Sequence, residues 1–110
     1  GGQPFLTPYS VSKGALSTLT KNLGNSLRKE RIRVNGINMG WCYTPGEVNI
    51  QASDGKPADW HETAKATQPF GRILVADDVV NMVLYLLSDL AEMMTGSVID
   101  LDQNVMGAYD

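Results

Sequence analysis

The sequence lacks the features that mark membrane, disulfide-bonded or nucleic-acid-binding proteins. Its 110 residues include one cysteine, Cys42, which excludes an internal disulfide and fits a reducing compartment such as the cytoplasm. No apolar run reaches the roughly 18 residues that a membrane-spanning helix needs. The nine Lys and Arg residues form no long block, and the formal net charge is −3. We therefore expect a cytoplasmic globular protein with no membrane and no nucleic-acid partner.

The sequence also lacks an initiator methionine, since it begins Gly1-Gly2-Gln3. Two glycines and two prolines in residues 1–8 predict a loop, because proline and glycine interrupt regular structure. A helix that carries the best chemical candidates follows at once. We therefore expect the chain to be a piece of a longer molecule.

Apolar periodicity predicts a first helix over residues 9–31. Its apolar stripe recurs at steps of three and four and consists of Leu16, Leu19, Leu23 and Leu27. Gly14 and Gly24 interrupt this helix, each at a cost of about 1 kcal/mol relative to alanine. Such gaps usually mean that another backbone comes close.

The remaining pattern predicts alternating strands and helices. Residues 32–38 and 97–101 are short and rich in β-branched residues, so we expect strands there. The stretch 47–69 is polar and irregular, with a short helix expected from residue 57 or 59 to about residue 67. So long an excursion usually covers a binding site. A helix is expected over residues 77–87. Strand, helix and strand form a parallel βαβ unit, and two strands need a larger sheet to be stable.

Tyr9 and Lys13 are the strongest candidates for chemistry. Side chains at i and i+4 share one helix face, and a cation beside a phenol favours the phenolate. Such a tyrosine can donate or accept a proton near neutral pH. By spacing alone, an ordinary polar pair at a helix start remains the alternative.

Five segments together resemble the C-terminal half of a short-chain dehydrogenase/reductase. In order they read YSVSKGAL, RIRVNGINMGWCYTP, PFGRI, DDVVNMVLYLLSD and MTGSVIDLDQ, and they cover essentially the whole chain. The resemblance implies an α/β fold, the C-terminal portion of a doubly wound parallel-sheet Rossmann-type domain. Residues 1–110 would form part of one dinucleotide-binding oxidoreductase domain, whose N-terminal cofactor-binding half is absent. Residues 47–67 would be the substrate lid.

The same resemblance implies the site residues. Tyr9 would exchange the proton and contact the cofactor, and Lys13 would assist it and bind the nicotinamide ribose. Gly40, the backbone of Cys42 and the hydroxyl of Thr44 would contact an NAD or NADP cofactor. Met39 stands where the family has proline, which affects the stiffness of the loop. No metal is expected.

The implied activity is NAD(P)-dependent interconversion of a secondary alcohol and a ketone, with sugars and polyols as candidate substrates. A tetramer is implied, built through the first helix and through the last helix and strand, with the tail 107–110 reaching a neighbouring subunit. The glycine-rich phosphate loop, the catalytic serine and the relay asparagine of the family are absent, so we expect the chain alone to be inactive. The alternative is a C-terminal fragment that serves only as a packing and association module.

Four further residues have more than one interpretation. Cys42 is expected to be a packed cysteine without a redox role, because nothing in its sequence neighbourhood would activate it. His61 is expected to be an exposed helix residue rather than a ligand contact. Trp41 could line a substrate pocket or pack the loop, and Trp60 is expected to pack.

Overall fold

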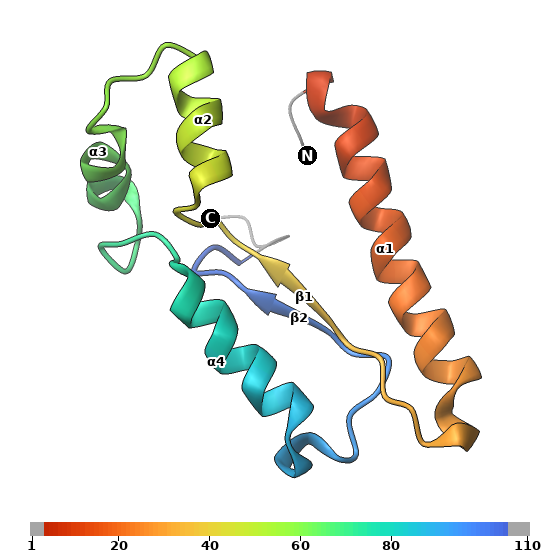
Figure 1. The fold of residues 1–110 in the computed structure, drawn as a ribbon. Coiled ribbons are helices and arrows are strands. Elements are labelled where there is room, and N and C mark those ends of the chain that lie inside the picture. Colours follow the sequence, from red (N-terminus) through yellow and green to blue (C-terminus); the bar gives the residue numbers. More distant parts are fainter. Residues whose placement is uncertain (1–3, 106–110) are drawn as a thin grey trace. The chain divides into compact units, whose positions relative to one another are not determined.

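The computed structural model describes residues 4–105. Its helices and strands are, in order, α1 (Thr7–Ser26), β1 (Gly36–Met39), α2 (Pro45–Ser53), α3 (Trp60–Thr67), α4 (Ala76–Leu87) and β2 (Val98–Leu101), with 3₁₀ turns at Pro4–Leu6, Arg28–Glu30 and Asp89–Ala91 (Figure 1). Within the described residues, the chain divides into two compact units. Unit 1 holds residues 4–37 and 86–99, and unit 2 holds residues 38–85 and 100–105. The predicted subunit contact of residues 107–110 lies outside the described residues.

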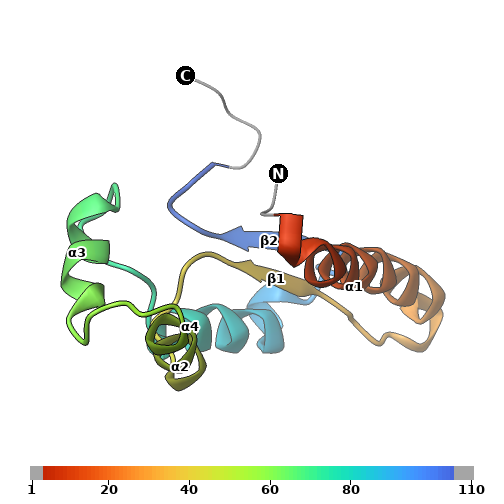
Figure 2. The ribbon, with the colours of Figure 1, turned by 90° about the horizontal axis from the view of Figure 1, so that it is seen from above.

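The two strands form a parallel pair and run side by side in both ribbon views (Figures 1 and 2). The N–H of Gly36 donates to the carbonyl of Ser97 at 2.8 Å, and the N–H of Gly40 donates to the carbonyl of Leu101 at 2.9 Å. The bonded positions advance together along both strands, which is the signature of parallel pairing. The predicted α/β class with a parallel sheet is confirmed.

The first strand begins four residues later than predicted, because side chains bind the preceding backbone. The N–H of Val34 donates to the Thr95 hydroxyl at 3.1 Å. The Asn35 amide donates to the carbonyl of Met94 at 3.0 Å and accepts from the N–H of Ser97 at 3.1 Å. The N–H of Val34 and the side chain of Asn35 thus make side-chain bonds in place of a regular strand ladder, which β-branched composition alone does not reveal.

Helix α1 starts and ends earlier than predicted. The loop prediction is wrong for the described residues before Tyr9, because Pro8 lies in the first turn of α1, where its missing N–H has no helical partner to lose. At the other end, the N–H of Leu27 donates to the carbonyl of Leu23 at 2.9 Å. A short 3₁₀ turn follows, and Arg31 then adopts a left-handed φ of 57° that ends the helical run.

The two glycines of α1 differ in what surrounds them. A Cβ on Gly24 would lie 2.6 Å from the nitrogen and 2.7 Å from the Cα of Gly96, so this part of α1 touches the turn before β2. A Cβ on Gly14 would meet nothing within 4 Å. Close backbone approach is therefore confirmed for Gly24, while Gly14 has no such neighbour among the described residues.

Helix α2 was not predicted, yet its first turn carries a clear sequence signal. Thr44 precedes the helix, Pro45 occupies its first turn, and the N–H of Glu47 donates to the Thr44 hydroxyl oxygen at 3.1 Å. A threonine followed three residues later by glutamate, with proline after the threonine, is a typical helix start. The lid region is thus more regular than its composition indicates.

The buried core of unit 2 forms around helix α3. Trp60 is 7% exposed and packs with Ala64 and Ile73, and Val48 of α2 packs against this group. Helix α3 lies at the position predicted for the short lid helix and ends at Thr67 as expected. Helix α4 also agrees with its prediction and begins one residue earlier, at Ala76.

Candidate active site

Tyr9 and Lys13 lie together on the exposed surface of the first turns of α1, in unit 1. The Lys13 Nζ atom is 5.3 Å from the centroid of the Tyr9 ring, so both side chains share one helix face as the spacing predicts. The Tyr9 side chain is open, with 59% of its surface exposed. The neighbouring Ser12 hydroxyl donates to the backbone carbonyl of Tyr9 at 2.7 Å. The phenol and the ammonium are therefore both accessible to a ligand.

The loop 40–44 follows β1 at its carboxyl end, in unit 2. Gly40, at its start, lies under the carboxylate of Asp102, since a Cβ on Gly40 would come within 2.5 Å of Asp102 Cγ and Oδ1. Gly40 therefore has a packing role that sequence reasoning missed, because it depends on a residue far along the chain.

Cys42 is held at the centre of this loop by a short parallel bridge to Leu74. Its side chain is buried, and the pKa of the thiol is raised, first by burial and then by the negative charge of Asp78. Both effects favour the protonated thiol, which is a weak nucleophile. This agrees with a packed cysteine and leaves the backbone as the part of Cys42 that could contact a cofactor.

Thr44 ends the loop and caps α2. Its oxygen accepts the N–H of Glu47, while a threonine hydroxyl also has one proton to donate. The N-terminus of a helix favours negative charge. Thr44 and the first turn of α2 thus offer a donor and a positive helix pole at the end of β1.

Aromatic side chains connect the loop to the lid helix. Trp41 stacks on Trp60 with centroids 5.6 Å apart, and its indole N–H donates to Glu47 Oε1 at 2.7 Å. Tyr43 stacks on Trp60 at 5.8 Å and meets the edge of His61 at 5.5 Å. Trp60 packs as expected. Trp41 packs the loop and also lines a cavity of about 300 Å³. Its role in a substrate pocket stays a prediction.

His61 is less exposed than expected. Its side chain is 30% exposed, and its Nε2 atom lies 3.1 Å from Glu62 Oε1. Its Nδ1 atom is buried and has no hydrogen-bond partner among residues 4–105. The prediction of an exposed helix histidine is therefore wrong, because the ring packs against the aromatic rings of Tyr43 and Trp60.

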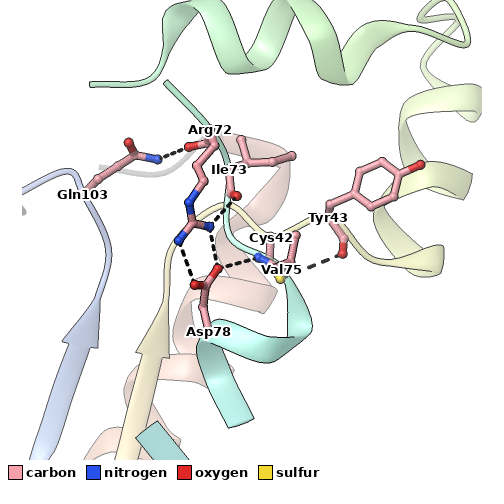
Figure 3. A network of polar contacts seen from close by, with 7 residues as sticks. All are labelled: Cys42, Tyr43, Arg72, Ile73, Val75, Asp78 and Gln103. Carbon is pink, nitrogen blue, oxygen red and sulfur yellow. Dashed lines mark hydrogen bonds and ion pairs between the residues drawn. The ribbon is translucent and has the colours of Figure 1, made fainter. Parts of the chain in front are cut away.

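A second cavity of unit 2, of about 520 Å³, combines aromatic, apolar and charged walls. Its lining residues are Tyr43, His61, Lys65, Arg72, Ile73, Val75 and Asp78. Figure 3 shows the polar network beside it, in which Arg72 and Asp78 form two bonds of 2.6 and 2.7 Å. The segment PFGRI, which contains Arg72, is one of those that carry the family resemblance. The pairing of Arg72 with Asp78 is not predicted by it. A pocket of this size and mixed lining is typical of small-molecule sites.

Asp78→Asn is expected to reduce the loss of stability in acid. The pKa of Asp78 is lowered from 3.8 to about 2, first by the hydrogen bond from Arg72 and then by that from the Val75 N–H. A carboxylate whose pKa is lowered by folding stabilises the folded state at pH values above its ordinary pKa. This stabilisation is lost as the pH falls through the lowered pKa. As the pH is lowered from 3.8 to about 2, the urea midpoint of unfolding should fall less in the Asn variant than in the parent. Equal falls would contradict the role of this carboxylate.

Residues 4–105 contain neither a membrane-spanning helix nor a cluster of metal ligands. No helix of residues 4–105 is long and apolar enough to cross a membrane. No group of three or more His, Cys, Asp or Glu side chains in these residues could hold a metal ion.

Comparison with known proteins relates the chain to a family of reductases. Residues 1–104 match the family described as "Enoyl-(Acyl carrier protein) reductase". A probable 2,4-dienoyl-CoA reductase of Caenorhabditis elegans is 34% identical over 101 residues, which cover 92% of this chain and 32% of the relative. The chain thus spans about a third of the length of this curated relative.

Two solved structures share the fold. A short chain dehydrogenase family protein from Francisella tularensis aligns with a TM-score of 0.78 at 30% identity, over 93% of this chain and 44% of its own. The L-sorbose reductase from Gluconobacter frateurii, solved with NADPH and L-sorbose, aligns with a TM-score of 0.77 at 27% identity, over 92% of this chain and 41% of its own. The strands β1 and β2 are parallel, and the family match covers residues 1–104. The chain therefore belongs to the short-chain dehydrogenase/reductase family.

Proposed function

We propose that this chain supplies the proton-transfer pair and part of the cofactor site of an NAD(P)-dependent oxidoreductase that interconverts a secondary alcohol and a ketone. The observation that carries the proposal is the Lys13 ammonium 5.3 Å from the centroid of the exposed Tyr9 ring. Family membership, and a relative solved with NADPH and a ketose, support the same chemistry. A sugar or polyol is the proposed substrate class.

The loop 40–44 would hold the cofactor, and its chemistry fits. The Thr44 hydroxyl retains a proton to donate, and the first turn of α2 adds a positive pole, which suits a pyrophosphate. The buried, protonated Cys42 side chain leaves its backbone to meet the carboxamide. Asp102 fills the space beside Gly40, so the cofactor would approach this loop from another side.

Tyr9, assisted by Lys13, would carry out the proton transfer. Bound NAD(P) supplies or accepts the hydride. In reduction, the Tyr9 hydroxyl donates its proton to the substrate carbonyl oxygen, and in oxidation the phenolate removes the proton from the alcohol. Lys13 stabilises the phenolate by its charge and binds the ribose hydroxyls. Each role requires only groups that lie exposed on one face of α1.

The working protein is proposed to include a further N-terminal part of the fold. The side chains of Leu16, Leu19 and Leu23 are between 39% and 56% exposed, an apolar surface that further structure would cover. The assembled enzyme, meaning this chain together with that part, is proposed to be a homo-oligomer, with a tetramer as the expected form. We propose that it acts in the cytoplasm.

Cofactor binding tests the proposal. NADPH and NADH fluorescence should change when the cofactor is titrated with the assembled enzyme, and should stay unchanged with this chain alone. A ketose should then be reduced with loss of the nicotinamide absorbance. Absence of binding by both preparations would instead favour the packing and association module.

A further inference from the structure

We infer that Gln103 is a positioning residue, which braces residues 70–75 and through them holds the loop 40–44 in the shape that binds cofactor. The inference rests on the proposed function, because it assumes that this loop contacts NAD(P). All the residues involved belong to unit 2.

The Gln103 amide clamps two backbone groups that are more than thirty positions earlier in the sequence. Its Oε1 atom accepts the N–H of Phe70 at 2.8 Å, and its Nε2 atom donates to the carbonyl of Arg72 at 2.7 Å. Figure 3 shows the second of these bonds. A side-chain amide accepts through its oxygen and donates through its nitrogen, so one residue can bind an N–H group and a carbonyl at once. Both polar ends of Gln103 therefore fix the start of the segment 70–75.

The far end of the same segment is fixed by Asp78. The N–H of Val75 donates to its carboxylate at 2.9 Å, and the same carboxylate binds Arg72. Arg72 also donates to the carbonyl of Ile73 at 3.3 Å. The segment is thus held by side chains before and after its centre.

The centre of the segment pairs with the proposed cofactor loop. The N–H of Leu74 donates to the carbonyl of Trp41 at 2.9 Å, and the N–H of Tyr43 donates to the carbonyl of Leu74 at 2.8 Å. Cys42 lies between these two bonds. Because each residue has only two soft backbone dihedrals, fixing Arg72 and Val75 leaves Leu74 little freedom to move. Gln103 therefore acts on the loop through the segment, since the side-chain bonds described for it go to Phe70 and Arg72.

Gln103→Ala is expected to weaken cofactor binding and spare the chemical step. Without the clamp, the loop adopts its binding shape only part of the time, and the apparent Kd rises in proportion to the lost fraction. We expect the Kd for NADPH to rise roughly 3- to 10-fold, with kcat at saturating cofactor close to that of the parent.

Amide hydrogen exchange in the assembled enzyme measures the brace without reference to activity. The N–H groups of Tyr43 and Leu74 should exchange about tenfold faster in Gln103→Ala, because local opening exposes them. Gln103→Met keeps the side-chain volume and removes both bonds, so it should behave like Gln103→Ala. The matched control is Asn104→Ala, since Asn104 is exposed and its amide binds only Asp102 and Gln68 among the described residues.

The exchange rates test whether Gln103 braces the loop, and the Kd for NADPH tests whether the brace affects cofactor binding. Parental exchange at Tyr43 and Leu74 in both Gln103 variants would overturn the brace. Faster exchange with an unchanged Kd for NADPH would overturn its effect on the cofactor. If the parent itself binds no NADPH, the proposed function fails and its cofactor role fails with it, while the exchange rates still decide whether Gln103 braces the loop.

Discussion

Tyr9→Phe is expected to lower kcat of the assembled enzyme by about 10²- to 10⁴-fold, the usual contribution of a positioned proton donor. Phenylalanine keeps the ring beside the Lys13 ammonium and removes only the hydroxyl that would exchange the proton. The Kd for NADPH should change little, because the Phe variant keeps the ring of residue 9 and most of the proposed contacts to the cofactor come from Lys13 and the loop 40–44. Steady-state rates with a ketose, together with a fluorescence titration of NADPH, measure the two effects separately.

Ser10→Ala provides a matched control, because it removes a hydroxyl from the adjacent residue of α1, which does not share the Tyr9–Lys13 face. Its kcat should equal that of the parent. If the Phe variant turned over at the parental rate, the proton donor would have to be sought elsewhere.

Gly24→Ala is expected to destabilise the assembled enzyme by about 2 kcal/mol, as inserted groups in packed positions typically do. The added Cβ would lie 2.6 Å from the nitrogen and 2.7 Å from the Cα of Gly96. Both of these Gly96 atoms belong to the backbone, so relieving the clash requires the helix or the turn to shift. The N–H of Gly96 also donates to the carbonyl of Val34 at 2.6 Å, which ties the turn to the chain before β1. Urea denaturation followed by circular dichroism measures the loss.

Gly14→Ala is the matched variant in the same helix. With nothing within 4 Å of its Cβ, the substitution should stabilise by up to about 1 kcal/mol through helix propensity. Opposite signs for the two variants would support the close contact at Gly24. A loss of equal size at Gly14 would attribute both effects to some other property of α1.

Local sequence patterns predicted the helices that bear apolar stripes, because such stripes repeat within one or two turns. They placed α4 to within one residue and indicated α3, while the predicted α1 starts two residues late and ends five residues late. Helix α2 was missed although Thr44, Pro45 and Glu47 carry its start signal, since a polar, glycine-containing stretch was interpreted as irregular. The late start of β1 was not predictable, because it depends on Thr95 binding the N–H of Val34 from 61 residues away.

The candidate site also has features that local sequence predicts and features that depend on distant residues. The shared face of Tyr9 and Lys13 follows from helix geometry alone and was predicted. The approach of Asp102 to Gly40 and the clamp by Gln103 join segments that are distant in sequence, and no local pattern encodes them. The roles of Gly40, Cys42 and Thr44 in binding the cofactor remain predictions.

The stacking of Trp41 on Trp60 makes this chain's indole emission a local reporter. The sequence has two tryptophans, and both lie in unit 2, 5.6 Å apart and inclined by 22°. Melting of α1 would therefore leave the fluorescence of this chain unchanged while its helical ellipticity fell. Thermal curves recorded with the two optical signals would superimpose only if both units unfold as one cooperative body.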